Sequence, residues 1–162
     1  FLAFTYPFMK RITYWPQLFL GITFNWGIVM AWTAINNNIS HEIIVLYISA
    51  IFWTLGYDTI YGTQDMSDDE IIGLKSTSIK FKKNIKSFVT FCYLVASSLI
   101  LLLFKSEIGL NFFSVFVFLF ILSLSYQLFK FNKYKPYTCL KMFKFNNYSG
   151  VFLFLSIILI DI

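Results

Sequence analysis

The chain is poor in the residues that build metal–thiolate sites and disulfide frameworks, since it has 2 cysteines and 1 histidine among 162 residues. Cys92 lies in an apolar stretch and Cys139 in a basic one, and neither has a second ligand at the spacing of a metal site. His41 stands apart from the cluster of acidic residues, and we expect it at the surface. Zinc binding and disulfide bonding are therefore not indicated.

Acidic residues are also scarce, at 8 against 13 basic ones, and charged residues make up 13% of the chain. Apolar residues make up 58%, whereas soluble domains hold roughly 45–50%. The pattern of a signal peptide, with a basic start, a short apolar core and a small-residue cleavage site, is missing. These features predict an all-α fold, a polytopic transmembrane helical bundle that forms a single membrane domain over residues 1–162.

Five apolar segments indicate five spans, at about 17–35, 43–57, 87–104, 108–129 and 148–160. A spanning helix needs about 20 residues at about 1.5 Å each. The second segment is short unless its helix continues into the acidic residues that follow it. The fifth is the shortest and runs into the chain end, and Phe1 already opens an apolar stretch. We therefore expect this chain to be a fragment of a longer protein.

Basic residues are concentrated on one side of these spans. The three regions on that side hold 12 of the 13, and the other two regions hold Lys105 alone. Such asymmetry places the basic regions in the cytoplasm, or in the matrix for a mitochondrial protein. The stretch 130–145 interleaves lysines with aromatic side chains, a composition that also occurs in nucleic-acid binding. Between two spans it favours a membrane interface, so the expected partner is the lipid bilayer of a bacterial or mitochondrial inner membrane, and no nucleic acid.

Five of the 8 acids fall within 58–70, on the basic side of the bilayer. They begin the region 58–86, which is much longer than the connections on the other side and carries its own apolar residues. Long loops with their own patterning are usually functional. We therefore interpret 58–86 as a functional loop, acidic and then basic, in the cytoplasm; the family resemblance given below implies that it is the active-site loop.

The spacing of three aspartates predicts a metal site if the second helix continues past Tyr57. Asp58, Asp65 and Asp69 are then spaced i, i+7 and i+11 and fall within about 40° of one another around the helix. Bare carboxylates about 6 Å apart repel by roughly 3 kcal/mol, so such a stripe favours a divalent cation. Oxygen ligands without histidine or cysteine suit Mg²⁺.

A second interpretation of the same residues needs no metal. Ser67 and Glu70 have the spacing of a capping box, with Asp68 and Asp69 in the first turn, where acidic side chains stabilise a helix. The two interpretations are compatible, and the spacing alone leaves both open.

The run YDTIYGTQDMSDDEIIGLKSTSIKF resembles the second aspartate-rich motif of the UbiA-type membrane prenyltransferases, and more narrowly that of the 4-hydroxybenzoate polyprenyltransferases. That motif reads roughly DxxYAxxDxxDDxxxGxKSTA. The matching residues are Asp58, Tyr61, Asp65, Asp68, Asp69, Gly73, Lys75, Ser76 and Thr77. Gly62 and Ser78 stand where alanine is usual, and both are changes between small residues. Upstream, YPFMKRITYWPQ resembles the segment with the family's YxxxK element, here Tyr6 and Lys10.

The resemblance implies a nine-helix fold of which this chain would form the last five helices. The family's first aspartate-rich motif, NDxxDxxxD, does not occur in residues 1–162. The chain would therefore contribute one half of the active site, and by itself it would be inactive.

The resemblance also implies the chemistry. A polyprenyl group would pass from polyprenyl diphosphate to the ring of 4-hydroxybenzoate, or a similar aromatic acceptor, in ubiquinone biosynthesis, with Mg²⁺ as cofactor. Asp58, Asp65 and Asp69 would be catalytic. The metal would be held by Asp65, Asp69 and Asp68. The diphosphate would be contacted by Lys10, Lys75, Tyr6 and Tyr61.

Asn25 is a polar residue in the middle of the first span, and such residues either line a pocket or bond a neighbouring helix. We include it as a candidate for the acceptor pocket. The sequence leaves two alternative functions open. The same fold could take a naphthoate, haem or a lipid as acceptor. A cation-binding transporter subunit is the other alternative, but it would need ionisable residues inside the spans, where this sequence has almost none.

Overall fold

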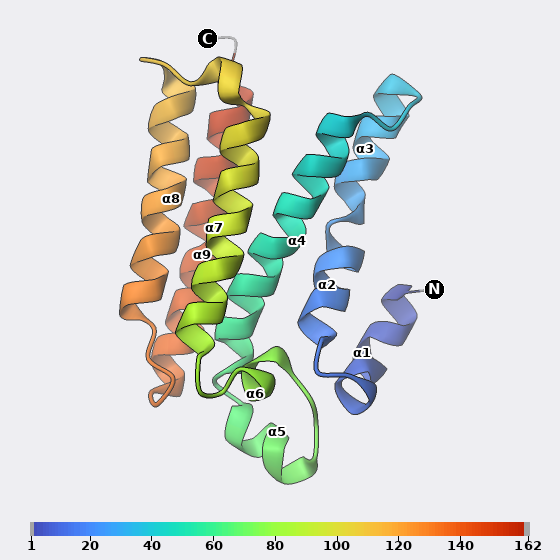
Figure 1. Cartoon of the computed structure of the whole chain (residues 1–162), viewed down its shortest axis with the longest axis vertical. Coiled ribbons are helices and arrows are strands. Elements are labelled where there is room, and N and C mark those ends of the chain that lie inside the picture. The colour runs from blue at the N-terminus through green and yellow to red at the C-terminus, as the bar shows by residue number, and fades with distance from the viewer. Residues whose placement is uncertain (1, 161–162) are drawn as a thin grey trace.

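Helices account for all regular elements between residues 2 and 160, the range that this computed structural model describes, without the side chains of residues 2, 3, 6 and 7. In chain order they are α1 (Leu2–Ile12), α2 (Pro16–Phe24), α3 (Trp26–Asn36), α4 (His41–Gly62), α5 (Met66–Ile72), α6 (Thr77–Lys80), α7 (Ile85–Leu103), the short 3-10 helix η1 (Lys105–Glu107), α8 (Phe112–Lys130) and α9 (Pro136–Ile158). Figure 1 shows α7, α8 and α9 grouped together, with α4 between this group and the pair α2 and α3. The all-α prediction is confirmed.

Four segments of the described range are long and apolar enough to cross a membrane: Pro16–Asn36, His41–Gly62, Ile85–Leu103 and Phe112–Lys130. They correspond to the first four predicted spans, and α2 and α3 together form the first of them. The polytopic helical bundle predicted from the apolar segments therefore has its physical basis in helices of bilayer length.

The fifth predicted span is only the last part of a longer helix. α9 begins at Pro136 rather than at Tyr148, and its 23 residues extend about 34 Å at about 1.5 Å each. The basic stretch 130–145 is therefore helical from Pro136 onward, and its interpretation as a membrane-interface segment stays a prediction. Proline suits the first turn of a helix. In the turns that follow, Cys139 and Met142 are buried on one face, while Lys141 and Lys144 stay exposed. Counting consecutive apolar residues does not detect a helix in which just one face is apolar.

The first span is interrupted in its middle at Asn25, where α2 ends and α3 begins. The Asn25 amide donates hydrogen bonds to the Gly21 carbonyl and to the Thr54 hydroxyl of α4, both at 2.8 Å. A polar side chain inside a bilayer is costly unless it is paired. Here the pairing fixes the interruption to α4, so Asn25 does bond a neighbouring helix.

α4 is the central helix and packs against α7, α2, α9 and α3. Its contact with α7 depends on small side chains. A Cβ added at Gly56 would lie 2.5 Å from the Tyr93 ring, and Ser49 donates to the Ala96 carbonyl at 2.9 Å. Small residues of this kind let the backbones of two spanning helices come close.

The apolar core lies between α7, α8 and α9, and α4 closes it on the fourth side. Val89 of α7 and Phe120 and Leu124 of α8 are at most 2% exposed. α8 packs most extensively against α9. This part of the chain is therefore a closed bundle, whereas α2 and α3 pack mainly against α4.

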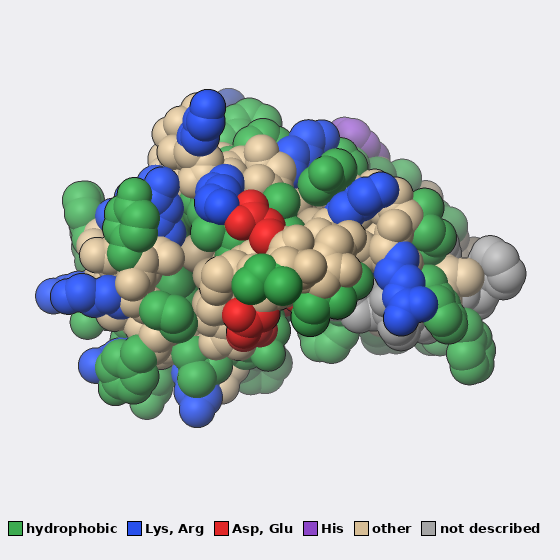
Figure 2. Space-filling model, turned by 90° about the horizontal axis from the view of Figure 1, so that it is seen from below, with side chains coloured by type: hydrophobic (Ala, Val, Ile, Leu, Met, Phe, Trp, Pro, Cys, Tyr) green, Lys and Arg blue, Asp and Glu red, His purple; other side chains and the backbone are tan. Residues whose placement is uncertain are grey.

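The basic connections lie together at one end of the bundle, with α5 and α6 (Figure 1). Seen from that end, lysine and arginine side chains surround a central group of acidic ones (Figure 2). The connections α3–α4 and α7–α8 lie at the opposite end. The grouping of the basic regions follows the predicted topology, and the cytoplasmic or matrix side of this end stays a prediction.

Candidate active site at the basic end of the bundle

The predicted continuation of the second span is confirmed, but the predicted acidic helix face is not. α4 runs through Asp58 and ends at Gly62. The chain then turns, and α5 begins at Met66 with Asp65 at its N-cap. Asp58 and Asp69 therefore lie on two different helices with Asp65 between them, and the expectation of one shared face was wrong.

A close contact between α4 and α6 accounts for this turn. A Cβ added at Gly62 would lie 2.9 Å from the Ser78 hydroxyl oxygen. Ser78 is fully buried and donates to the Thr59 carbonyl at 2.8 Å, and the hydroxyl oxygens of Thr59 and Thr77 are 2.7 Å apart. The chain must turn after Gly62 to bring α6 back onto the last turns of α4, and a straight continuation of α4 would prevent this.

The capping-box interpretation was wrong in its N-cap. Ser67 lies inside α5, and the N-cap residue Asp65 makes no side-chain cap hydrogen bond. Asp68 and Asp69 do occupy the first turn, where the helix dipole favours acidic side chains. The helix ends at Gly73, whose φ of 78° is the left-handed conformation that glycine adopts without strain.

Asp69 is the most shielded acid of the motif, with 10% of its side chain exposed. The Lys10 ammonium group of α1 donates to its carboxylate at 3.0 Å, across 59 residues of sequence. Asp58 lies within electrostatic range of the same ammonium group. One cation from α1 therefore interacts with acidic side chains of both α4 and α5.

Lys75 holds the end of the acidic motif against α1. Its backbone N–H donates to the Lys10 carbonyl at 2.7 Å, and its ammonium group donates to the Ile12 carbonyl at 3.2 Å. A lysine at a helix C-terminus compensates the partial negative charge of the last carbonyls. The two lysines that the resemblance singled out are thus joined through their backbones, and Lys75 also stabilises the end of α1.

Gln17 of α2 is a further residue at this site, and it was not predicted. It is 3% exposed, and its side-chain oxygen accepts a hydrogen bond from the Thr77 N–H at 3.0 Å. A Cβ added at Gly62 would lie 3.0 Å from its side-chain nitrogen. Its signal in the sequence was its place at the end of YPFMKRITYWPQ, the segment that the structure brings against the acidic motif.

The other carboxylates of the motif are more open. Asp65 and Asp68 are exposed, and Asp58 is half-buried. Within residues 2–160 as described, no three acidic, histidine or cysteine side chains lie close enough to share a metal ion. Mg²⁺ does not need such a set, because it usually takes one or two carboxylates and completes its shell with water and phosphate oxygens. An oxygen-only, partly open donor set fits that preference.

A cleft of about 510 Å³ lies between the middle of the first span, α4 and α9. Trp53 and Tyr57 of α4 and Phe143 of α9 give it aromatic walls, and its other lining residues include Asn25 and Asn146. It is lined by no acidic or basic side chain. Tyr57, which lines the cleft, precedes Asp58 on α4, so the cleft reaches the level of that residue along the helix, although Asp58 itself is not part of the lining. Asn25 therefore lines a cleft as well as bonding α4.

Tyr61 and Tyr6 are the two tyrosines predicted to contact the diphosphate. Tyr61 is half-buried, and its ring centre lies 4.5 Å from that of Phe143. It therefore stands between the acidic motif and the cleft. Tyr6 lies in α1, the helix that carries Lys10, but its side chain lies outside the described residues.

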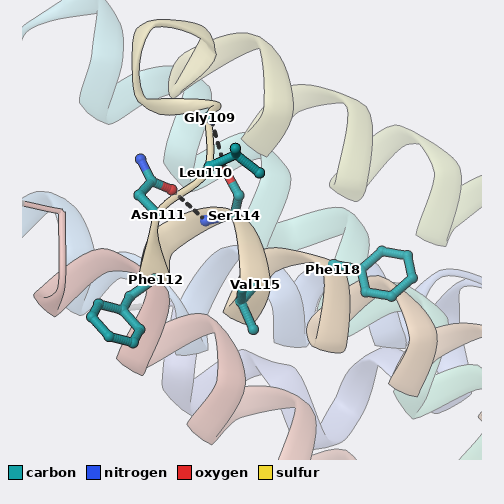
Figure 3. Close-up of a pocket in the computed structure, with 7 residues that line it drawn as sticks. All are labelled: Gly109, Leu110, Asn111, Phe112, Ser114, Val115 and Phe118. Carbon is teal, nitrogen blue, oxygen red and sulfur yellow. Dashed lines mark hydrogen bonds between the residues drawn. The ribbon is translucent and has the colours of Figure 1, made fainter.

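A larger hollow of about 670 Å³ lies at the opposite end of the bundle, at the start of α8. Figure 3 shows Phe112, Val115 and Phe118 along this helix, with the Ser114 hydroxyl accepting from the Gly109 N–H at 3.0 Å. The lining has no charged side chain and no contact with the acidic motif. It offers no group that would hold a diphosphate or a metal ion, so the candidate site is the smaller cleft.

The model of the UbiA prenyltransferase family matches residues 1–157. The chain belongs to the UbiA prenyltransferase family. The resemblance carried by the acidic motif and the YxxxK element is thereby confirmed as a family relationship that extends along nearly the whole chain.

Curated relatives match over a similar range. The protein named "4-hydroxybenzoate polyprenyltransferase, mitochondrial" of Bos taurus is 40% identical over 161 residues, which cover 96% of this chain and 42% of the relative. The Homo sapiens protein of the same name is 40% identical over 98% of this chain and 43% of its own length. "4-hydroxybenzoate geranyltransferase 1" of Lithospermum erythrorhizon is 40% identical over 97% and 52%. The chain thus spans about half the length of these relatives, or less.

A solved structure, the "Apo structure of a UbiA homolog from Aeropyrum pernix K1", has a similar arrangement of helices. It matches with a TM-score of 0.77 and 23% identity over 97% of this chain and 59% of that chain. At this identity the likeness shows the fold, and the helical membrane fold implied by the resemblance is confirmed for the part covered.

Asn25 was a candidate for the acceptor pocket, but the aromatic walls of the cleft and Asn146 were not predicted. Trp53 and Tyr57 were hidden among the many aromatic residues of the spans. Asn146 had a signal, because two adjacent asparagines interrupt the apolar end of α9. The two asparagines indicate a polar position within a helix only when that helix is known to begin at Pro136, since Asn146 then lies inside it.

Proposed function

We propose that the protein transfers a polyprenyl group from a polyprenyl diphosphate to the ring of 4-hydroxybenzoate, as a step of ubiquinone biosynthesis. The observation that supports this most is the continuity between the acidic motif and an aromatic cleft. Asp69 of α5 and Lys10 of α1 form an ion pair, and the Lys10 ammonium group lies within electrostatic range of Asp58 near the end of α4. Tyr57 and Tyr61 of α4 extend from this end to the cleft and to Phe143. Relatives whose names contain this acceptor match at 40% identity.

The acidic motif is the proposed diphosphate end of the site. Asp65 and Asp69 are the principal candidate ligands of Mg²⁺, with Asp58 and Asp68 next. When bound, Mg²⁺ supplies a Lewis acid that offsets the charge of the leaving diphosphate. Lys10 supplies a fixed positive charge beside Asp69, and diphosphate oxygens would replace this carboxylate as its partner.

Three further side chains complete the proposed diphosphate end. Lys75 adds a second ammonium group close to the end of α1. Tyr61 and Tyr6 are proposed to donate hydrogen bonds to diphosphate oxygens. These donors would share the negative charge with the metal, which lowers the charge that any one of them must balance.

The cleft is the proposed place of carbon–carbon bond formation. The bond between the allylic carbon and the diphosphate oxygen breaks, and its electron pair stays on the diphosphate. A ring carbon beside the phenolic hydroxyl supplies the pair for the new bond, and its proton leaves to restore aromaticity. The ring faces of Trp53, Tyr57 and Phe143 stabilise positive charge on the allylic fragment. An apolar wall also limits access of water, which would otherwise capture that fragment.

The proposed place of action is a bacterial or mitochondrial inner membrane, with the acidic motif on the cytoplasmic or matrix side. The basic connections at that end of the bundle support this orientation. A cysteine introduced at exposed Lys83, in a cysteine-free background, should react with a membrane-impermeant thiol reagent only when the reagent has access to that side.

The complete protein encoded by the gene, assayed in membranes with polyprenyl diphosphate and Mg²⁺, tests the proposed reaction. We expect prenylated 4-hydroxybenzoate, no product from a naphthoate, and loss of turnover when Mg²⁺ is chelated. Prenylation of the naphthoate but not of 4-hydroxybenzoate would refute the acceptor. Cation uptake into proteoliposomes without prenyl transfer would instead support a transporter.

Residues 1–162 alone provide a second test. We expect no product from them, because they lack the family's first aspartate-rich motif. Product formation by the purified 162-residue chain would contradict the proposal that it supplies one half of the diphosphate site.

A further inference from the structure

A network of neutral polar side chains crosses the middle of the bundle next to the cleft. The Asn146 side-chain oxygen accepts from the Trp53 indole N–H at 3.0 Å and from the Gln127 amide at 3.4 Å. Gln127 also donates to the Ser149 hydroxyl at 2.9 Å and accepts from the Tyr93 hydroxyl at 2.7 Å. Polar groups at this depth in a membrane protein are costly, and they are kept where they pair or act on a ligand.

The network determines which way the Asn146 amide faces. The indole N–H of Trp53 can only donate, so the Asn146 atom that meets it is the oxygen and the NH₂ group lies on the other side. Gln127 donates to the same oxygen and holds the amide in this orientation. The two donors therefore leave Asn146 with its own N–H groups to offer elsewhere.

The Asn146 NH₂ group has no hydrogen-bond partner among the described residues, and Asn146 lines the cleft. Among the described residues, Trp32 Nε1 is the single buried side-chain nitrogen or oxygen without a hydrogen-bond partner, so the Asn146 nitrogen is not buried in the protein. No described residue accepts a hydrogen bond from it. Asn146 lines the cleft, so a ligand there meets a fixed donor.

The position of this donor suits the far end of a small aromatic ligand. Trp53, which contacts Asn146, precedes Asp58 by five residues on α4, which is about 7.5 Å of helix. That distance is comparable to the length of a benzene ring with one substituent. An aromatic ring bound between the level of Trp53 and the level of Asp58 would have one polar substituent at Asn146. Its opposite side would face the diphosphate end of the site.

We propose that the Asn146 amide donates a hydrogen bond to a carboxylate oxygen of the aromatic acceptor, and that Trp53 and Gln127 position it. This inference rests on the proposed function. A carboxylate oxygen accepts hydrogen bonds and donates none, which matches a group that offers only N–H. Placed at Asn146, the acceptor's negative charge also lies away from the aspartates of the motif.

The decisive measurement is a pair of acceptors that differ in the carboxylate, 4-hydroxybenzoate and 4-methylphenol, with the complete protein. Asn146→Ala should raise the KM for 4-hydroxybenzoate about tenfold to a hundredfold, since a hydrogen bond to a charged group is lost. The KM for polyprenyl diphosphate and the kcat/KM for 4-methylphenol should change less than about twofold, within the range expected when no partner is lost. Asn84→Ala, an exposed asparagine far from the cleft, is the matched control.

Asn146→Asp keeps the test open if the alanine variant does not fold. Its shape is the same and an oxygen still faces Trp53, but the donor is replaced by a second oxygen. It should raise the KM for 4-hydroxybenzoate at least as much as alanine does, and Asn146→Gln should recover part of the loss. If Asn146→Ala or Asn146→Asp changed the kinetics of both acceptors equally, or of neither, the role of Asn146 would be overturned.

Trp53→Phe tests the positioning role. It keeps an aromatic wall but removes the indole N–H, so the Asn146 amide can turn over. The KM for 4-hydroxybenzoate should rise several-fold while the KM for the diphosphate stays unchanged, which a merely structural defect would not produce. If the unmutated protein prenylates no 4-hydroxybenzoate, the proposed function fails first. If it does and these variants show no such split, only the present inference fails.

Discussion

Two polar regions lie next to each other along α4, and they are built in opposite ways. The acidic motif, residues 58–75, is charged, partly exposed and held by contacts with α1 and α6. The network around Asn146 is neutral, largely buried and paired among α4, α7, α8 and α9. The first region has unpaired carboxylates available for a ligand, whereas the second has a single free donor.

We expect the acidic motif to contribute to ligand binding and the network to contribute to folding stability. Charges that await a ligand add little to folding, because exposed carboxylates repel and gain nothing from burial. Buried, mutually satisfied groups hold helices in register. Substitutions of the charged side chains of the motif should therefore change activity more than stability. Substitutions in the network should do the reverse, except at Asn146 and at Trp53 and Gln127, which position it.

The largest expected effect is on turnover at the motif. Asp69→Asn and Asp65→Asn should each reduce kcat at least about 100-fold, which corresponds to about 3 kcal/mol of lost stabilisation of the transition state. Initial rates at saturating substrates measure this. Glu70→Gln is the matched control, because Glu70 is a neighbouring acid that pairs with Lys82 instead. If both variants had rates within threefold of that control, a difference of about 0.7 kcal/mol in activation free energy, the assignment of Asp65 and Asp69 as metal ligands would be wrong.

The second-largest effect is on stability, at Gly62 and Ser78, the two positions where the chain departs from the family motif and which lie in contact with each other. Gly62→Ala should lower the free energy of unfolding by about 1–3 kcal/mol, because the added methyl group would lie 2.9 Å from the Ser78 oxygen. Ser78→Ala should cost about 1 kcal/mol through its lost bond to Thr59. Thermal unfolding in detergent measures both.

The double variant of Gly62 and Ser78 sharpens this prediction. It places alanine, which is usual in the motif, at both positions. It also removes the Ser78 hydroxyl, the nearer of the two polar atoms that the new methyl group would meet, and leaves the Gln17 side-chain nitrogen at 3.0 Å. We expect it to be more stable than the sum of the single effects by at least about 0.5 kcal/mol. Simple additivity would show that the two positions do not compensate each other.

A smaller effect on stability is expected in the network. Tyr93→Phe removes the hydroxyl that donates to the buried Gln127 at 2.7 Å and should cost about 0.5–1.5 kcal/mol of unfolding free energy. Turnover should stay within twofold of that of the unmutated protein, a change of about 0.4 kcal/mol. Tyr126→Phe, at an exposed position of α8, controls for loss of a hydroxyl alone. Equal melting temperatures for the two variants would mean that the network contributes nothing to stability.

The smallest effect is expected at the rim of the motif. The ion pair of Lys82 and Glu70 joins side chains that are 51% and 34% exposed. Exposed pairs of this kind contribute about 0–1 kcal/mol and are screened by salt. Lys82→Gln should therefore leave the melting temperature nearly unchanged at physiological salt. A clear loss of stability would mean that the rim is held more tightly than the contrast between the two regions implies.

Apolar segments and charge asymmetry were enough to predict the helical class, four spans and the grouping of the basic regions. These features could be predicted because they depend on neighbouring residues or on sums along the chain, and on no contact between distant segments. The acidic motif was found for the same reason, since its residues are close in sequence. Its connection to the upstream segment was suggested only by the family resemblance, because the ion pair of Lys10 and Asp69 joins residues 59 positions apart.

The interruptions of helices could not be predicted from periodicity. α4 stops at Gly62 because α6 packs on it, and the first span is interrupted at Asn25 because that amide bonds α4. Both causes are contacts between distant segments. The early start of α9 was missed for another reason, since Cys139 and Met142 show their burial only when α8 and α4 are in place.

Gly73 shows how the distance between charges in the motif is set by backbone handedness. It is left-handed at φ 78° with open space around its Cα, so an added methyl group would meet no atom and would only strain the backbone. The following residues depend on this turn, because the Leu74 N–H returns to the Asp69 carbonyl and the Lys75 N–H to that of Lys10. A residue without any side-chain chemistry thus acts as the spacer between the carboxylate and the ammonium groups, and its replacement would change their separation while leaving every charge in place.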